Sequence, residues 1–384
     1  MKAILNRDFI ALILSVAVVG LGSGATLPLT ALALTQRGFG TDVVGVLTAA
    51  QAGGGLLIVP FAGRLAARLG ARRSIVTAVV CVALATAALQ VTSNLAVWAV
   101  LRALCGAALM LLFTIGEAWV NELADDATRG RVVAVYATNF TLFQMAGPIL
   151  VSQIDTLPHV RFLLCGAIFL LALPALRAIR VAPRLADEHS EHGDWKQVLP
   201  QMPALVIGTG FFALFDTLAL SLLPLFGMAH GVTSDVAVLF ASALLFGDTT
   251  MQFPIGWLAD HIGRGRVHAG CAAVVIVLLP VLPWAVSTWL RWPLLFALGA
   301  AAGAIYTLSI VACGERFRGA ALVSASSITG AAWSGASFGG PLVAGALMKV
   351  TSSDAVVGVL VAGAVMFAAT LWWEQRRGGV RVTG

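Results

Sequence analysis

The chain has 384 residues, of which 59% are hydrophobic and 11% are charged, and its formal net charge is +6. This composition is too apolar for an ordinary water-soluble domain, and crossing a bilayer takes about 20 apolar residues of helix. The length therefore allows about twelve spans, and we expect an all-α integral membrane protein rather than a soluble enzyme.

Twelve apolar segments follow one another, and most of the loops between them are short. Because unpaired backbone groups are costly in lipid, each segment is expected to be a helix. The segments cover roughly residues 9–35, 43–62, 74–93, 95–121, 132–153, 162–179, 204–226, 236–255, 267–287, 293–314, 320–348 and 355–373.

A single polar stretch, residues 180–203, interrupts this rhythm between the sixth and seventh segments. We interpret it as a cytoplasmic linker with a short surface helix around Trp195–Leu199. The expected domains are an N-terminal six-helix bundle at 1–179, the linker, and a C-terminal six-helix bundle at 204–384.

The two halves repeat each other at a shift of 193 residues. Under this shift Asp42 falls on Asp235, Gly106 on Gly299, Glu122 on Glu315, and Gly147-Pro148 on Gly340-Pro341. An internal repeat in a hydrophobic chain indicates two pseudo-symmetric bundles facing each other across a central path. This arrangement suits the movement of a solute better than its chemical conversion.

The basic residues lie mainly on one side of the predicted spans. If both termini are cytoplasmic, nineteen Lys and Arg residues lie inside and only Arg37, Arg161, Arg291 and Lys349 lie outside. This bias predicts cytoplasmic termini and explains the net charge without a nucleic-acid partner.

No pattern in the sequence indicates a metal site or a cofactor. The five cysteines lie inside apolar segments without metal-ligand spacing, and no phosphate-binding loop of the GxxxxGK[ST] type is present. We therefore expect neither metal nor cofactor, and a proton gradient as the energy source.

Two related loops carry a family resemblance. Residues 63–73 read GRLAARLGARR, after the second segment, and residues 256–266 read GWLADHIGRGR, after the eighth. With the repeated halves and the polar linker, they resemble the major facilitator superfamily over the whole chain. Within it, the Gly116-Glu117 stretch before Arg129 and the Cys313-Gly-Glu315 stretch are similar to the YcaD-type, drug-exporter-like bacterial branch.

The resemblance implies a twelve-helix transporter of the bacterial cytoplasmic (inner) membrane, surrounded by lipid and functional as a monomer. It also implies that the two loops, which begin at Gly63 and Gly256, form a cytoplasmic gate. In the second loop, Asp260 and Arg264 are expected to form a latch with Glu315. A static surface ion pair is the alternative.

The first loop departs from the family pattern. Ala67 and Ala71 replace the expected Asp and Arg, which leaves Glu122 without its expected partner. Arg72 is a candidate substitute. We expect an asymmetric gate in which the C-terminal loop dominates.

Four ionisable residues lie within the predicted spans: Arg102, Glu117, Asp216 and Asp248. Such residues are costly in lipid and usually face a cavity or a partner. Arg102, followed by Gly106, resembles the Arg-x-x-x-Gly element of proton-coupled exporters, and Glu117 is expected on roughly the same helix face. Structural roles remain open for all four residues.

A carboxyl group in a low-dielectric site exchanges protons nearer neutral pH than one in water. It can bind a proton or a cationic substrate but not both, which is the minimal requirement for antiport. We therefore expect Arg102, Glu117, Asp216 and Asp248 to mediate proton and substrate coupling.

Several apolar or weakly polar side chains are candidates to line a cavity, although each can equally pack or face lipid. Together they favour a small amphiphilic substrate over a sugar or phosphate. These candidates are Phe143, Gln144, Phe211, Phe212, Phe215, Gln252, Tyr306 and Trp333.

The leading hypothesis is a secondary active transporter that exports small amphiphilic compounds in exchange for protons by alternating access. The alternative is a proton-coupled importer or uniporter of a small metabolite, such as an organic acid attracted by Arg102. A non-transporting membrane sensor and a membrane enzyme are less favoured, and the enzyme lacks a recognisable catalytic group.

Overall fold

The computed structural model describes residues 7–123, 129–178 and 195–376, and all regular secondary structure in these ranges is helical. The first half contains α1 (Arg7–Gln36), α2 (Thr41–Leu69), α3 (Ala71–Ala88), α4 (Leu95–Leu123), α5 (Arg129–Ile154), α6 (Arg161–Leu170) and α7 (Ala172–Ala178). The second contains α8 (Trp195–Val198), η1 (Leu199–Gln201), α9 (Pro203–Ser221), α10 (Leu223–Ala229), α11 (Ser234–Ile262), α12 (Arg264–Leu278), η2 (Leu279–Val281), α13 (Leu282–Ala285), α14 (Arg291–Arg316), α15 (Gly319–Val350) and α16 (Ala355–Arg376).

Every predicted apolar segment corresponds to one helix or to a run of consecutive short helices, although the third segment, 74–93, extends five residues beyond the end of α3. Proline interrupts the seventh segment at Pro224 and the ninth at Pro280 and Pro283, because proline removes a backbone donor. Of the described helices and helix runs, nine are long and apolar enough to cross a membrane. The other segments are α5, the α6–α7 pair, which is broken at Leu171, and the Gly- and Ser-rich α15.

The interpretation of residues 63–73 and 256–266 as loops was largely wrong. Helix α2 continues to Leu69 and α11 to Ile262, so each loop shrinks to a single glycine between two helices. Gly70 has a φ of 80° and Gly263 a φ of 97°, a backbone region that side chains with a Cβ rarely adopt. The repeated glycine therefore makes the turn, and the preceding residues remain helical.

The repeat seen in the sequence is also a repeat of helix contacts. Helix α1 packs on α5 and α2 on α4, as α9 packs on α15 and α11 on α14. Gly106 lies against the Gln51 carbonyl, and its equivalent Gly299 lies against the Leu244 carbonyl, so close that neither position has room for a Cβ. Small residues at these crossings let the helix backbones touch.

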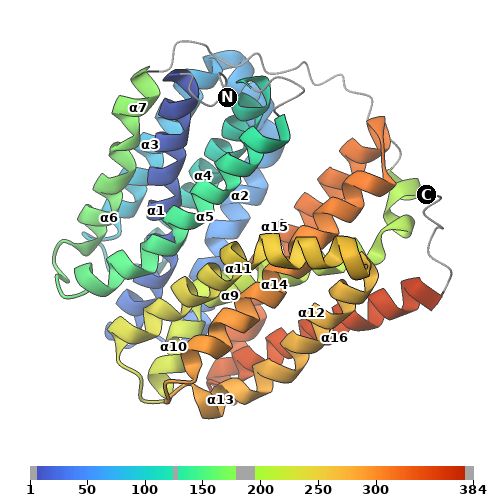
Figure 1. The fold of residues 1–384 in the computed structure, drawn as a ribbon. Coiled ribbons are helices and arrows are strands. Elements are labelled where there is room, and N and C mark those ends of the chain that lie inside the picture. Colours follow the sequence, from blue (N-terminus) through green and yellow to red (C-terminus); the bar gives the residue numbers. More distant parts are fainter. Residues whose placement is uncertain (1–6, 124–128, 179–194, 377–384) are drawn as a thin grey trace.

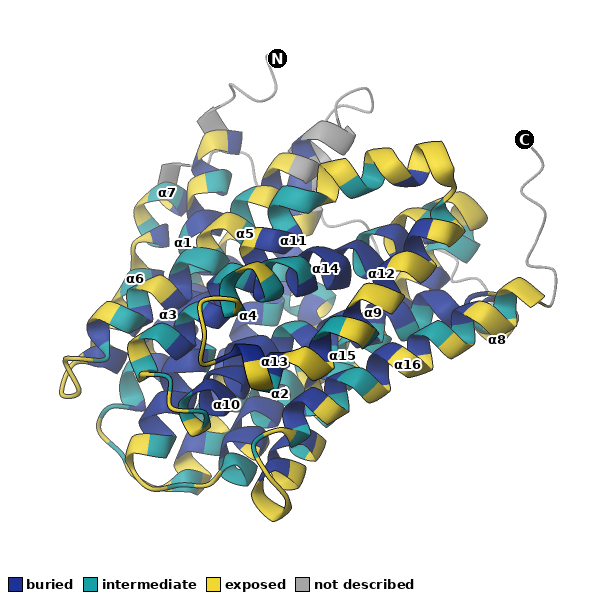
Figure 2. Ribbon diagram, turned by 60° about the horizontal axis from the view of Figure 1, so that its bottom comes forward, coloured by how far each residue is buried: buried dark blue, intermediate teal, exposed yellow. Residues whose placement is uncertain are grey.

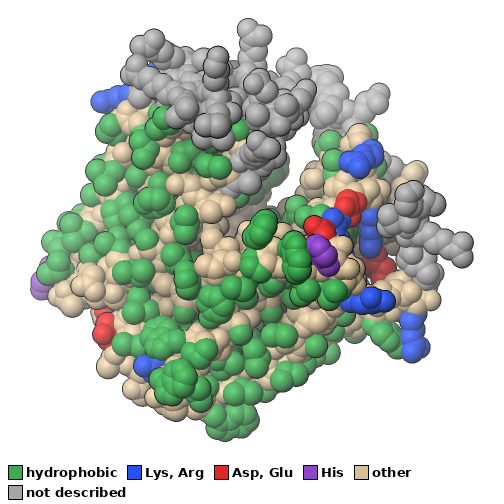
Figure 3. Space-filling view, in the orientation of Figure 1, with side chains coloured by type: hydrophobic (Ala, Val, Ile, Leu, Met, Phe, Trp, Pro, Cys, Tyr) green, Lys and Arg blue, Asp and Glu red, His purple; other side chains and the backbone are tan. Residues whose placement is uncertain are grey.

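The two bundles meet at one end of the molecule and diverge toward the other. We call the end with Gly70 and Gly263 the signature-loop end, and the other, with Asp42 and Lys349, the Asp42 end. The halves contact each other through α2 with α15 and through α5 with α11. Figure 1 shows them spreading apart toward the side of the N-terminus, and Figure 3 shows a hollow between them on that side.

The sides of the bundle expose large apolar side chains, among them Phe253 (82% exposed) and Trp284 (75% exposed). Figure 2 shows exposed positions along the outer faces of the helices and buried positions between them. Figure 3 shows a surface that is mostly hydrophobic. Such a surface would aggregate in water but is suited to lipid, so the chain is a multi-pass membrane protein.

The described part of the linker packs on the C-terminal half. Helix α8 covers most of the predicted surface helix, and its Trp195 is exposed while Val198 is buried. Val198 and Met202 share a small apolar cluster with Phe317. Residues 180–194 of the linker lie outside the described residues.

Candidate functional site

Asp216 and Asp248 line the same pocket in the C-terminal half. Asp216 lies in the middle of the α9–α10 run and Asp248 in the middle of α11, which places both carboxylates between the ends of the bundle. The rest of the lining is apolar and comprises Phe212, Phe215, Ala219, Leu220, Ala241, Leu244, Leu245 and Gly299. The structure thus brings together two of the four predicted intramembrane charges.

These carboxylates have little hydrogen bonding. Asp248 is 6% exposed and accepts one hydrogen bond, from Nε2 of Gln252 to Oδ1 at 3.2 Å. Among the described residues, no group forms a hydrogen bond or ion pair with Asp216. Carboxylates without a compensating cation in an apolar pocket are unstable when ionised and favour a proton or a bound cation.

Gly303 creates the space for Asp248. The Asp248 side chain of α11 lies where a Cβ on Gly303 of α14 would be. One turn away, the crossing of these helices is fixed by Gly299. The position of the carboxylate is therefore built into the packing of α11 on α14.

Three aromatic residues adjoin the pocket. The Phe212 ring stacks on Tyr306 at a centroid distance of 5.1 Å and lies 5.8 Å from Trp333. Tyr306 and Trp333 meet edge to face at 5.3 Å. Phe212 also lines the carboxylate pocket, so the aromatic cluster (Phe212, Tyr306 and Trp333) borders the pocket through this residue.

Glu117 belongs to the other half of the molecule but lies toward the same region. Its side chain on α4 is exposed, and it interacts electrostatically with Tyr136 of its own half. Tyr306 of α14 interacts electrostatically with both Glu117 and Asp248. Glu117 and Asp248, one from each half, are therefore both within electrostatic range of Tyr306.

Arg102 has different surroundings from Glu117, although the sequence suggested one cavity for both. Arg102 is fully buried, and its Nε, Nη1 and Nη2 atoms have no hydrogen-bond partner among the described residues. The groups that interact with it electrostatically are the thiols of Cys105 on α4 and Cys165 on α6. Its guanidinium therefore lies within the N-terminal bundle rather than at the hollow between the halves.

The remaining candidate lining residues are dispersed. Phe215 lines the carboxylate pocket, and Phe211 is buried at 2% exposure and packs on Gly363 of α16. On α5, Phe143 is 41% exposed, and the backbone of Gln144 lies against Gly24 of α1.

The second signature loop forms the charge cluster that its sequence predicts. Arg264 donates from Nη2 to Oδ1 of Asp260 at 3.2 Å and forms an ion pair through Nη1 with Glu315. All three residues belong to the C-terminal half and are partly or largely exposed. Gly256, at the start of this loop, faces open space.

The first signature loop has no comparable cluster in the described part of the chain. Arg72 donates to the carbonyl of Arg177 at 2.9 Å, and no described residue forms an ion pair with Arg64, Arg68 or Arg73. Gly63 lies within α2. The side chain of Glu122 lies outside the described residues.

Contacts between the halves at the Asp42 end were not predicted as a site. Lys349 Nζ of α15 lies 2.8 Å from Oδ2 of Asp42 on α2, and Thr41 donates to the Gly345 carbonyl at 3.0 Å. At the other seam, Ser242 of α11 donates to the Met145 carbonyl of α5 at 2.7 Å. Lys349 was the available signal, as one of only four basic residues assigned to this side.

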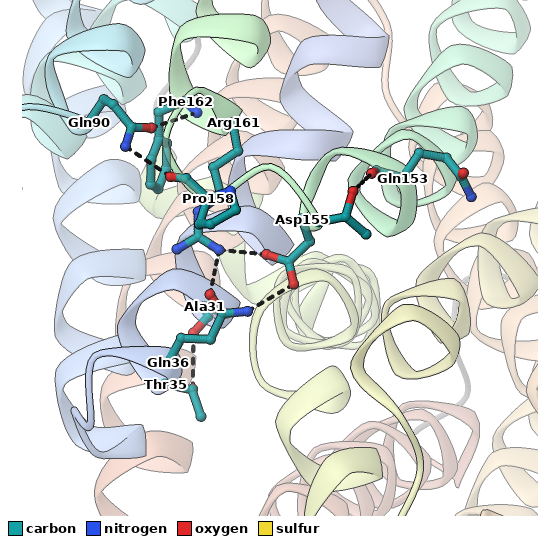
Figure 4. A network of polar contacts seen from close by, with 10 residues as sticks. Ala31, Thr35, Gln36, Gln90, Gln153, Asp155, Pro158, Arg161 and Phe162 are labelled. Atoms are coloured by element: carbon teal, nitrogen blue, oxygen red, sulfur yellow. Dashed lines mark hydrogen bonds and ion pairs between the residues drawn. The ribbon is translucent and has the colours of Figure 1, made fainter.

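A polar network around the buried Arg161 lies in the N-terminal half at the same end, as Figure 4 shows. Arg161 of α6 donates to Asp155 at 2.6 Å and to Gln36 of α1 at 2.5 Å. Gln36 donates in turn to the second oxygen of Asp155 at 2.9 Å. The network ties the ends of α1, α5 and α6 together and supports the α5 surface on which α11 packs.

No group of His, Cys, Asp and Glu in the described ranges is arranged to hold a metal ion. The arrangement as a whole offers acids that can exchange protons, an aromatic surface, and an opening at one end.

Comparisons with known proteins agree with this arrangement. The family model of the Major Facilitator Superfamily matches residues 12–247. The uncharacterized MFS-type transporter YfkF of Bacillus subtilis is 24% identical over 363 residues, 90% of each chain. The uncharacterized MFS-type transporter YE1530 of Yersinia enterocolitica is 26% identical over 347 residues, 87% of this chain and 86% of the relative.

Two solved structures share the fold. An inward-facing, unoccupied bacterial homologue of the human lysosomal transporter Spinster has a TM-score of 0.78 at 14% identity, with 96% of each chain covered. The nucleoside transporter NupG has a TM-score of 0.77 at 12% identity, with 97% of this chain and 100% of that chain covered. The similar proteins are transporters, not enzymes.

Proposed function

From the premise that the chain belongs to the Major Facilitator Superfamily, whose family model matches residues 12–247, we propose that this secondary transporter exports small amphiphilic compounds in exchange for protons. The observation that carries the proposal is the pocket shared by Asp216 and Asp248. Two acids from two helices, of which only Asp248 accepts a hydrogen bond, from Gln252, and beside which no described residue supplies a cation, form a site at which a proton and a substrate compete.

Alternating access follows from the shape of the molecule. The halves are in contact at the Asp42 end and diverge toward the signature-loop end, so the central region has one open side. Rocking one bundle against the other would open the Asp42 end and bring the signature loops together. In that second state, the cluster of Asp260, Arg264 and Glu315 would meet the N-terminal half as a gate.

The distribution of basic residues supports an orientation. We place the signature-loop end, both termini and the 180–203 linker in the cytoplasm, because nineteen of the assigned Lys and Arg residues fall on that side. The structure then represents the inward-open state. The domains are bundles at 1–179 and 204–384 joined by the linker, in a monomer of the bacterial inner membrane.

Membership of the YcaD-type, drug-exporter-like branch and a role of Arg102 in coupling belong to the same proposal. The alternative is import of a small metabolite, a direction with which the shared fold of the nucleoside transporter NupG is compatible. An organic acid is the less favoured substrate, because Arg102 is enclosed by its own bundle and the carboxylate pocket is lined by two acids and no basic side chain.

A proton-flux screen tests the proposal. The purified protein is reconstituted in proteoliposomes that contain a pH-sensitive dye, and a compound library is added without an imposed gradient. We expect some compounds to drive protons in the direction opposite to their own movement. Co-directional protons would indicate symport, and compound transport without proton movement would indicate a uniporter.

A further inference from the structure

Building on the proposed function, we propose that the transported compound is an organic cation with a flat apolar group, and that it binds in the C-terminal half. Its charge would be neutralised by Asp216 and Asp248, and its apolar group would lie on the aromatic cluster of Phe212, Tyr306 and Trp333. The proposal names a substrate class and a location that proton coupling alone does not require.

The first support is the sign of the charges. No basic side chain lines the carboxylate pocket. Glu117, from the other half, adds a third acid within electrostatic reach of Tyr306. Arg102, the intramembrane cation of the N-terminal bundle, is fully buried beside Cys105 and Cys165. The region therefore attracts cations and repels anions.

The second support is that the aromatic cluster and the carboxylate pocket share Phe212. Phe212 lies in both, since its ring stacks on Tyr306 and it also lines the pocket. Tyr306 and Trp333 are only partly buried, so part of each side chain is accessible. A cation close to such rings is attracted by their electron-rich faces, and a flat group can stack on them.

The third support comes from the repeat. Under the 193-residue shift, Phe212, Tyr306 and Trp333 correspond to Val19, Phe113 and Phe140. Phe113 and Phe140 meet edge to face at 4.7 Å, which reproduces the geometry of Tyr306 with Trp333. The aromatic pair is thus part of the common scaffold, whereas its polar ring atoms and the third ring occur only in the C-terminal half.

The acids show the same asymmetry. Asp216 and Asp248 correspond to Ser23 and Gly55. Gly303, which leaves space for Asp248, corresponds to Met110, and a Cβ added to Gly55 would lie 3.6 Å from Cβ of Met110. Each half therefore fills the same crossing, one with a methionine and the other with a carboxylate. Packing alone would be satisfied by the apolar version, so the charge in the C-terminal half points to a ligand.

The test is equilibrium binding to the purified full-length protein, with phenyl-substituted probes of similar size and different charge. The probes are tetraphenylphosphonium, the tetraphenylborate anion, and neutral triphenylphosphine oxide, each corrected for binding to empty detergent micelles. We expect the cation to bind at least about tenfold more tightly than the other two. Equal or tighter binding of the anion or the neutral compound would overturn the proposal.

Variants locate the binding site. Asp248→Asn and Trp333→Leu should each weaken binding of tetraphenylphosphonium roughly tenfold, while Phe140→Leu, at the equivalent position in the other half, should leave it within about twofold. Size-exclusion profiles and melting temperatures confirm that each variant is folded, and Trp333→Phe provides a milder change if Trp333→Leu is not. An equal loss in Phe140→Leu, or no loss in Asp248→Asn and Trp333→Phe, would refute the location.

These measurements use no proton gradient, so they fail independently of the proposed function. If proton-coupled transport is found for neutral or anionic compounds and the phosphonium cation does not bind, the substrate class is wrong and proton coupling stands. If the cation binds at this site but moves no protons, the coupling is wrong and the substrate class stands.

Discussion

Asp248 of α11 and Gly303 of α14 occupy one shared space, because the aspartate side chain lies where a Cβ on residue 303 would be. In the first half the glycine is on the other helix of the pair: Gly55 takes the place of Asp248, and it lies against Met110, which takes the place of Gly303. The crossing of α11 and α14 thus contains a carboxylate, whereas the equivalent crossing of α2 and α4 is apolar. The carboxylate stays in position only while residue 303 has no side chain.

Gly303→Ala is therefore expected to impair function at a position that has no chemistry of its own. The added methyl group would displace Asp248 or separate α11 from α14, at a cost of roughly 1–3 kcal/mol for overpacking. We expect pH-driven transport in proteoliposomes to fall well below that of the parent protein. The control is Gly358→Ala on α16, where a Cβ meets open space. Equal rates for both variants would show that Asp248 is not held by this contact.

The ion pair between Asp42 and Lys349 should bias the balance between the two access states. Asp42→Asn removes a partly exposed pair worth about 0–1 kcal/mol, so the state open at the Asp42 end should become up to about fivefold more populated. Labelling of an introduced cysteine in the hollow measures this change. Asp235→Asn is the control, because this equivalent residue has no ion pair in the described part of the chain. An equal shift in both variants would exclude the ion pair as the cause.

Changes in the second signature loop should exceed those in the first. Arg264→Ala leaves Asp260 and Glu315 as neighbouring like charges, and Asp260→Asn removes one side of the cluster. Arg68→Ala and Arg72→Ala break no ion pair among the described residues. We expect the first two to lower the initial transport rate several-fold more than the last two. Equal effects would show that the asymmetry of the loops has no functional role.

Much of the fold follows from regularities that a single sequence displays. Long apolar runs predicted the helices, and the repeat at 193 residues predicted two similar bundles, in which the structure pairs α2 with α4 and α11 with α14. The signature loops were misjudged, since their charged residues suggested loops although glycine alone makes each turn. Charge next to a membrane span does not distinguish a loop from the end of a helix.

The candidate site was only partly accessible from the sequence. Asp216 and Asp248 could be singled out as costly charges, but their shared pocket depends on how α9 packs beside α11. The surroundings of the Arg102 side chain could not be predicted either. Helical periodicity gives the angle between two residues around one helix, but it does not identify the neighbouring helix that each residue faces. Contacts between the halves, such as that of Lys349 with Asp42, depend on the conformational state and leave only a weak trace in the sequence.

The orientation can be tested by chemical labelling. Ser190→Cys and Ser353→Cys are introduced into a variant without native cysteines, and intact cells are treated with a membrane-impermeant thiol reagent. The charge bias predicts modification at 353 and none at 190 until the cells are permeabilised. The reverse pattern would invert the topology and with it the assignment of the open end.

Comparison of neutralised acids tests the central claim most directly. Glu117→Gln, Asp216→Asn and Asp248→Asn are reconstituted and measured for pH-driven transport and for substrate counterflow, with Asp235→Asn as the control outside the pocket. The proton-coupled account predicts that at least one of the three loses pH-driven transport and keeps counterflow, because the proton step is lost and the fold is not. The shared pocket favours Asp216 and Asp248, and the sequence favoured Glu117. If all three keep full pH-driven transport, the account is contradicted and a uniporter describes the protein better.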